Sequence, residues 1–199
     1  MIDIVIPNQD HEQFVNMAKK LGFNKLIFFG KSKKKTLETY SCDWKGKHDL
    51  LCANENIRQV VEKKKVDFIF ECEKEPRSDF IHQRNSGLNH IICRFAKENN
   101  IAVAFSFSSL LNLRTRAKIM GRMAQNIKLC RKYGLKMIIA SFADEPYKMR
   151  APSDLISLFV TLGMQKSQAK DALTHAYKLI AEKKHNDGHL LANGVEIVK

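Results

Sequence analysis

The sequence predicts an α/β fold in which helices surround a parallel sheet. Short apolar runs alternate with amphipathic segments along the chain, as parallel strands alternate with their crossover helices. An apolar run near each end, Ile2–Ile6 and Gly194–Val198, allows the first and last strands to pair and close a barrel. Two connections in the first third are shorter than the dozen or so residues that a parallel crossover needs. We therefore predict an irregular TIM-like barrel of about seven to eight strands with helices outside, formed by residues 1–199 as a single domain.

The first third predicts four strands but only one long helix. That helix is indicated by an apolar stripe at helical spacing from Phe14 to Leu21, which ends at Gly22. The lysine-rich segment Lys31–Lys35 has the composition of a solvated loop. If all four apolar runs are strands, this part of the chain cannot be regular βαβ. The predicted strands are Ile2–Ile6, Leu26–Phe29, Thr36–Cys42 and His48–Ala53.

The remainder of the chain alternates regularly between strands and helices. Asn89 suits the N-cap of one helix, and Pro152 suits the first turn of another. The polar segment between Glu71 and Ser86 is expected to be irregular. The predicted strands are Val66–Phe70, Ile101–Phe105, Lys136–Ala140 and Gly194–Val198. The predicted helices are Asn54–Lys64, Asn89–Asn99, Leu110–Tyr133 (the longest), Pro152–Leu162 and Ser167–Ala181.

The composition is that of an ordinary globular protein, but the charge is not balanced. The 34 Lys and Arg residues outnumber the 21 Asp and Glu residues and give a net charge of +13. An excess of this size favours a polyanionic partner, nucleic acid first, over the alternative of a basic proteome. No apolar run has the length of a membrane span and no basic leader precedes Ile2, so we expect a cytoplasmic protein without a membrane partner. The five cysteines form no CxxC pair, which is typical of free thiols in a reducing compartment.

Catalytic motifs are not evident in the sequence. The seven histidines do not fall into HxH or HExxH spacing, and only Asp3 and Asp144 are expected near strand ends where a metal ligand would be useful. Ser106, Ser108 and Ser109 follow a strand but lack a GxSxG elbow. The nine glycines form no phosphate-binding loop. We therefore expect no metal site, no catalytic residue and no cofactor bound by the chain itself.

The strongest binding signal is a basic stripe on the longest predicted helix. At 100° per residue one face collects cations, whereas Met120, Met123, Ile127 and Cys130 lie opposite. A charged face is usually only solvated, but no acid lies between Arg114 and Arg131 to form an ion pair within the helix. A phosphate backbone is therefore as plausible a partner for this face as solvent. The stripe comprises Arg114, Lys118, Arg122, Gln125, Lys128 and Lys132; further cations stand at His90, Arg94, Lys97 and Arg150.

An ordered set of short blocks resembles the archaeal ribonuclease P protein component 3 family, whose eukaryotic homologue is the thirty-kilodalton subunit of RNase P. The most recognisable block joins Ile138–Ser141 to the Arg150–Leu155 run, RAPSDL. The resemblance covers nearly the whole chain and is firmest from Val66 to Met164. The other blocks are Val66–Ile69, Ser86–His90, Ile101–Phe105, Arg116–Lys118, Asn126, Lys128, Arg131–Lys132 and Gly194–Val198.

The resemblance implies a barrel-shaped subunit of an RNA-based enzyme. In such particles an RNA with bound Mg²⁺ removes the 5′ leader of precursor tRNA, which this subunit would reach only indirectly. The partners implied are the RNase P RNA, a small ferredoxin-like RNase P subunit and other RNase P proteins. Arg116 could instead be a buried structural cation. The residues expected to contact RNA are Arg94, Arg114, Arg116, Lys118, Arg122, Lys128, Lys132 and Arg150.

Two other functions remain open at this stage. The family is related to the polymerase-and-histidinol-phosphatase barrels, so one alternative is a metal-dependent phosphoesterase. The other is a generic basic nucleic-acid-binding domain that needs no protein partner.

Overall fold

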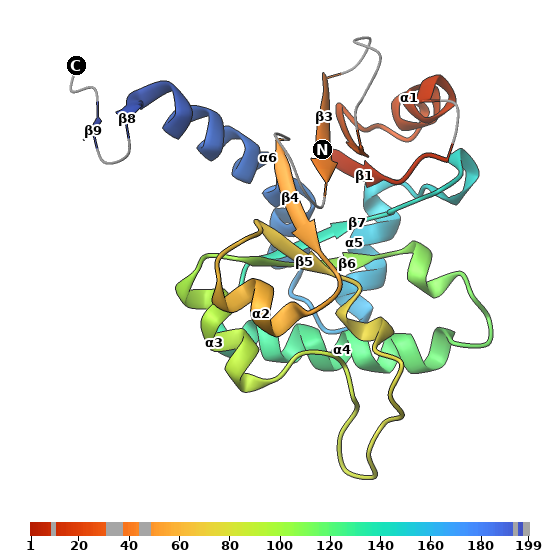
Figure 1. The fold of residues 1–199 in the computed structure, drawn as a ribbon. Helices are drawn as coiled ribbons and strands as arrows, with labels where there is room; N and C mark the ends of the chain where they lie inside the picture. Colours follow the sequence, from red (N-terminus) through yellow and green to blue (C-terminus); the bar gives the residue numbers. More distant parts are fainter. Residues whose placement is uncertain (9–10, 31–37, 44–48, 193–194, 197–199) are drawn as a thin grey trace.

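The structure is a computed structural model that describes residues 1–8, 11–30, 38–43, 49–192 and 195–196. Seven parallel strands follow one another around a barrel in the order of the sequence (Figure 1). The apolar runs form strands because both faces of a barrel strand are buried, one against the interior and one against helices. The strands are β1 (Ile2–Val5), β2 (Lys25–Phe29), β3 (Glu38–Asp43), β4 (Leu50–Ala53), β5 (Phe68–Phe70), β6 (Ala102–Ser106) and β7 (Met137–Ala140).

The barrel closes between β7 and β1. The Phe142 N–H donates to the Ile4 carbonyl and the Ile6 N–H to the Ala143 carbonyl, both at 2.8 Å. The buried carboxylate of Asp3 accepts hydrogen bonds in the same seam from the Ser141 N–H at 2.7 Å and from the Ser141 hydroxyl. Burial raises the pKa of Asp3 to about 6, because its effect is larger than that of the hydrogen bonds, which lower the pKa. Asp3 is thus a link between the first and seventh strands.

The prediction that Gly194–Val198 would close the barrel was wrong. The described part of this segment lies in β9 (Val195–Glu196), which pairs antiparallel with β8 (Leu190–Ala192) in a separate two-stranded sheet. The physical reason is that Phe142 and Ala143, directly after β7, already bond along the open edge of β1, so that edge is not free for a last strand. Residues 194, 197 and 198 lie outside the described ranges.

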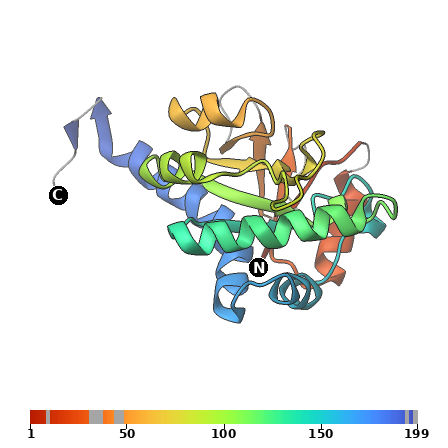
Figure 2. The same cartoon turned by 90° about the horizontal axis from the view of Figure 1, so that it is seen from below.

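The last long helix, α6 (Lys166–His189), covers the amino-terminal end of the barrel. Its Ala176, Leu179 and Ile180 join the apolar cluster that fills the barrel interior. Polar contacts fix it to residues at the starts of strands: Lys183 pairs with Asp67 at 2.5 Å, and the Lys25 ammonium lies 3.6 Å from the centroid of the Tyr177 ring. Beyond these contacts the helix continues away from the barrel and carries β8 and β9 with it (Figures 1 and 2).

The other helices lie against the outer surface of the sheet. Helix α4 lies beside α3 along one side of the barrel (Figure 2). Asn89 caps α3 as predicted, since its side chain accepts from the Ile92 N–H at 2.9 Å. None of the helices in the described ranges is both long and apolar enough to cross a bilayer. The helices against the outer surface are α1 (His11–Lys20), α2 (Ile57–Glu62), α3 (His90–Glu98), α4 (Arg116–Tyr133) and α5 (Pro152–Thr161).

Two helix predictions need correction. The helix predicted from Leu110 begins only at Arg116, because the chain first forms a separate 3₁₀ turn over Ser108–Leu110. Helix α6, with 24 residues, is longer than α4, with 18, because it extends past Ala181 to His189.

The predicted irregularity in the first third is confirmed. Strands β2, β3 and β4 are all parallel neighbours, yet only residues 30–37 and 44–49 connect them. Segment Lys31–Lys35 falls outside the described residues. This side of the barrel is therefore built differently from the side that carries α3 and α4.

Candidate nucleic-acid interface

Phenylalanine rings occupy the carboxyl-terminal mouth of the barrel, where a TIM-barrel enzyme usually has its active site. Phe29 ends β2, Phe70 ends β5 and Phe142 follows β7. The centroids of Phe29 and Phe70 lie 5.4 Å apart, and Phe70 stacks on Phe142 at 5.4 Å with a 9° angle between the rings. The mouth of the barrel is thus lined by packed aromatic side chains.

The two aspartates considered as metal ligands lie in other settings. Asp3 is sealed in the β1–β7 seam, and Asp144 pairs with Lys148 at 3.0 Å. Among the described residues, no three His, Cys, Asp or Glu side chains are grouped closely enough to hold a metal ion. At the end of β6, Ser106 and Ser108 share a hydrogen bond between their hydroxyls, and the Ser108 hydroxyl donates to the Phe142 carbonyl, each at 2.9 Å. These side chains connect two strand ends.

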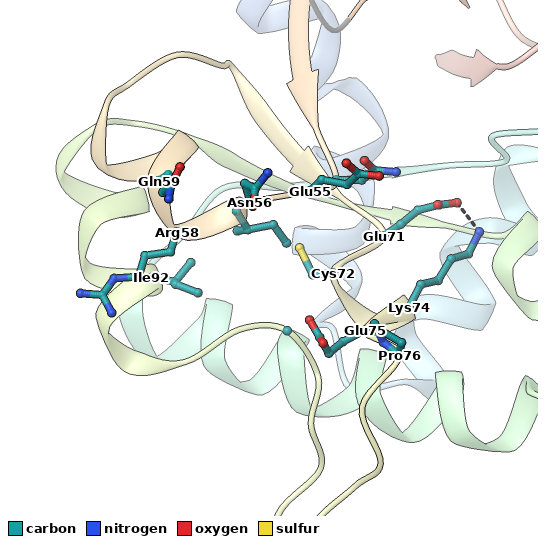
Figure 3. A pocket seen from close by; sticks show the side chains of 13 residues that line it. Glu55, Asn56, Arg58, Gln59, Glu71, Cys72, Lys74, Glu75, Pro76 and Ile92 are labelled. Atoms are coloured by element: carbon teal, nitrogen blue, oxygen red, sulfur yellow. Dashed lines mark hydrogen bonds and ion pairs between the residues drawn. The ribbon is translucent and has the colours of Figure 1, made fainter.

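A cavity of about 790 Å³ opens beside the carboxyl ends of β4 and β5 (Figure 3). Glu55, Glu71 and Glu75 stand around it, and Glu71 forms an ion pair with Lys74 at 2.5 Å. The thiol of Cys72 also lines it, but burial raises the pKa of that thiol well above its ordinary value. A protonated thiol is a poor nucleophile, and the carboxylates repel phosphate. This hollow does not suit a nucleic-acid backbone.

Arg122 corrects the predicted basic stripe. It is only 1% exposed, because the segment between β5 and α3 folds back over the middle of α4. Its guanidinium donates to the Asp79 carboxylate at 2.7 Å and to the backbone carbonyls of Glu73 at 3.0 Å, Glu75 at 2.6 Å and Arg77 at 2.5 Å. Arg122 therefore organises residues 73–79 and is not available to RNA as an exposed cation.

The charge of Asp79 is held by the same network. Burial tends to raise the pKa of Asp79, but hydrogen bonds from Arg122 and from the Asn85 N–H outweigh it and hold the pKa below its usual value. The carboxylate therefore remains ionised beside Arg122. The positive charge of Arg122 offsets that of the Asp79 carboxylate at this loop.

Two more side chains of α4 fix the second half of the same segment. Gln125 donates to the Arg84 carbonyl at 2.8 Å and accepts from the Arg84 N–H at 3.2 Å. Asn126 donates to the Ser86 carbonyl at 2.8 Å. The chain then passes so close to Cys72 that a Cβ on Gly87 would lie 2.1 Å from the Cys72 carbonyl oxygen, and only glycine fits there. We call residues 75–86 the braced loop.

Five predicted site residues do lie exposed on α4 or just before it. Arg116 is one of them: its Nε donates to the Leu110 carbonyl at 2.7 Å while the residue stays exposed, so the alternative of a buried structural cation is wrong. Arg94 is exposed on α3, which packs beside α4. The exposed cations of α4 and of the residues just before it are Arg114, Arg116, Lys118, Lys128 and Lys132.

Arg150 is placed apart from these residues. Its guanidinium lies 5.0 Å from the ring centroid of Phe107 and donates to the carbonyls of Tyr147 at 2.9 Å and Met149 at 2.7 Å. Arg150 is carried by the segment between β7 and α5. In both views this segment lies towards one end of α4, and helix α3 lies towards the other end (Figures 1 and 2). The structure thus brings most of the predicted cations together along α4 and places Arg150 elsewhere.

The sequence reasoning missed the braced loop. Arg77 and Arg84, with side chains 81% and 50% exposed, add cations beside α4. Phe80 and Ile81 are 63% and 96% exposed at its tip. The available signal was an adjacent apolar pair within a stretch that is otherwise polar.

Comparison with known proteins identifies the group to which the chain is related. The family model of RNase P subunit p30 matches residues 55–187, two thirds of the chain. The chain belongs to the p30 family. The match spans α2 through most of α6, including α4 and the braced loop, which confirms the resemblance seen in the sequence.

Curated relatives of this chain carry the name ribonuclease P protein component 3. The relative from Methanothermobacter thermautotrophicus is 29% identical over 143 residues, which cover 71% of this chain and 56% of the relative. The relative from Methanococcoides burtonii is 36% identical over 116 residues, which cover 57% and 48%. The chain spans about half the length of the curated relatives it matches.

A solved structure supports the same fold. One chain of a cryo-EM structure of archaeal ribonuclease P with mature tRNA superimposes with a TM-score of 0.80. The match covers 100% of this chain and 98% of the other at 22% sequence identity. At that identity the match establishes the TIM-like barrel architecture.

Proposed function

We propose that this chain is a protein subunit of ribonuclease P, the enzyme that removes the 5′ leader of precursor tRNA. Its role would be to support the catalytic RNA through a basic surface, with residues 1–199 acting as a single domain in the cytoplasm. The observation that carries the proposal is the family match together with the exposed cations of α4, all of which lie within the matched region.

The chemistry of the surface fits this role. No acidic residue lies between Arg114 and Arg131, so the cations of α4 are not neutralised within the helix. A row of Lys and Arg of this kind binds phosphates without regard to base sequence and releases counterions as it does so. The side chains near the barrel mouth make contacts within the protein, as described above. In this proposal Mg²⁺ is bound by the RNA, and the chain contributes no catalytic residue.

The proposed partners follow from the family and from the charge. They are the RNase P RNA, a small ferredoxin-like subunit and other RNase P proteins, with precursor tRNA reached indirectly. Arg94, Arg114, Arg116, Lys118, Lys128, Lys132 and Arg150 remain the proposed RNA contacts. Arg122 supports the interface by holding the braced loop.

The test is precursor-tRNA cleavage by reconstituted ribonuclease P RNA and partner proteins, with and without this chain. We expect a higher cleavage rate or a lower Mg²⁺ requirement only when the chain is present. No effect, combined with metal-dependent phosphoesterase activity of the chain alone, would instead support the phosphoesterase alternative. Equal binding to unrelated RNAs without any effect on cleavage would indicate a generic nucleic-acid-binding domain.

A further inference from the structure

The tip of the braced loop exposes two adjacent apolar side chains. Phe80 is 63% exposed and Ile81 is 96% exposed. Single exposed apolar residues are common on protein surfaces, but these two are adjacent and belong to the loop between β5 and α3, which reaches beyond α4 (Figure 1). Exposing apolar side chains to water has an unfavourable free energy, and a partner that buries these two side chains removes it.

The tip is held in place before any partner binds. The Phe80 N–H donates to the Gln83 carbonyl at 2.9 Å, which closes the turn. On either side of the turn, Asp79 is held by Arg122, and Arg84 is held by Gln125. The Arg84 guanidinium also packs over Gly121, where an added Cβ would lie 2.4 Å from its Cζ atom. A tip that is already ordered loses little conformational entropy on binding.

A groove of about 520 Å³ lies between this loop, the start of α3 and the second half of α4. Arg77, Arg84, His90 and Lys132 line it, together with the rings of Phe80 and Tyr133. Glu75 is the acidic residue among its lining side chains, and it lies 3.7 Å from the Arg77 guanidinium. The volume is within the range of small-ligand sites, and the lining combines cations with aromatic rings.

We infer that this groove binds an unpaired nucleotide of the ribonuclease P RNA. The base packs against Phe80, and the flanking phosphates meet Arg84 and Lys132. Aromatic rings beside cations are how proteins hold single-stranded RNA, because every base has a stacking face and every linkage a charge. The inference rests on the proposed function and deepens it by naming where a base is held.

The charge distribution favours RNA over a protein partner. The groove presents Arg77, Arg84 and Lys132 against Glu75, and the nearby Asp79 carboxylate pairs with Arg122 at 2.7 Å and lies 3.7 Å from the Arg84 guanidinium. A surface with this excess of positive charge attracts a polyanion. The hollow beside β4 and β5 sets three glutamates against Arg58 and Lys74 and so has no such excess of positive charge.

The experiment is to titrate full-length chain into an otherwise complete reconstituted particle and to measure its affinity for the particle and its stimulation of cleavage. We expect Phe80→Ala to weaken binding roughly tenfold, since stacking on an aromatic side chain contributes about 1–3 kcal/mol per base. Phe80→Trp should retain affinity because it keeps a stacking face. Leu113→Ala is the matched control, since Leu113 is 76% exposed and lies outside the groove lining.

A photoreactive phenylalanine analogue at position 80 distinguishes the two kinds of partner. A cross-link to an unpaired nucleotide of the ribonuclease P RNA supports the proposal. A cross-link to a protein subunit, or a Phe80→Ala variant that binds like wild type, overturns it. If the wild-type chain stimulates cleavage and Phe80→Ala binds the particle with the same affinity, the proposed nucleotide site is rejected and the proposed function stands. If the wild-type chain binds through Phe80 without stimulating cleavage, the proposed function is rejected and the nucleotide site stands. If the wild-type chain does not bind the particle, both are rejected.

Discussion

The middle of α4 and its two ends carry the same kind of residue in opposite surroundings. Arg122 in the middle is buried and bonded to one carboxylate and three carbonyls. Arg114 and Lys118 near the start, and Lys128 and Lys132 near the end, are exposed. The difference is made by the segment from Glu73 to Ser86, which covers only the middle. A cation on one helix is therefore structural or available for binding according to what another part of the chain does.

The largest expected effect comes from removing the covered cation. Arg122→Ala should lower the free energy of unfolding by about 3–5 kcal/mol, because it leaves Asp79 and three backbone carbonyls without their buried donor. Urea denaturation measures the change. Lys118→Ala, an exposed position one turn earlier on α4, should change it by less than about 0.5 kcal/mol. Equal effects at the two positions would remove the distinction between the middle and the end of the helix.

A second prediction concerns Glu73, a buried residue of the same segment, whose backbone carbonyl accepts from Arg122. Burial raises its pKa to about 7 from an ordinary value of 4.5, and its Oε1 atom has no hydrogen-bond partner. Because the unfolded chain ionises this carboxyl near pH 4.5 and the folded chain only near pH 7, wild-type stability should fall as the pH rises between these values and stay lower above pH 7.

Glu73→Gln removes this ionisation and keeps the shape of the side chain. We expect the variant to be about 3 kcal/mol more stable than wild type at pH 8 and of similar stability at pH 4, from about 1.4 kcal/mol per pKa unit. Thermal or urea unfolding across this pH range would show it. The exposed Glu98→Gln serves as the control; a constant difference between Glu73→Gln and wild type at all pH values would contradict the prediction.

The smallest effect on stability, and the most specific effect on binding, is expected at the ends of α4. Changing Arg114, Lys118, Lys128 and Lys132 together to Gln should leave the free energy of unfolding within about 0.5 kcal/mol per position. The dependence of RNA affinity on salt should become shallower, by about 0.7–0.9 in the slope of log K against log salt for each phosphate that the variant no longer neutralises. An unchanged slope would exclude these four cations as ligands of the RNA backbone.

Much of the fold was predictable from local pattern. The strands from Phe68 to Ala140 are short apolar runs because both of their faces are buried, and Asn89 and Pro152 mark helix starts through local chemistry. The closing strand was not predictable in this way. The segment after Gly194 and the strand Met137–Ala140 are both apolar, and only packing in three dimensions decides which of them meets Ile2–Val5.

The interface was predictable in part for the same reason. A helical wheel groups Arg122 with Lys118 and Lys128, but it does not show that Asp79 and the carbonyls before it return across 43 residues to cover one member. Arg114, Lys118, Lys128 and Lys132 followed from the wheel, because in the described part of the chain they stay exposed. The braced loop and its tip did not, since irregular backbone has no period to detect.

The position of α6 at the amino-terminal end of the barrel has a consequence for synthesis of the protein. Ala176, Leu179 and Ile180 complete the interior cluster that also contains Phe68, Ala102 and Ile138 from three separate strands. On a ribosome these strands emerge well before the helix that seals them. The interior of the nascent barrel therefore stays open to water until residues 166–180 of α6 have been translated, and this helix then completes the core.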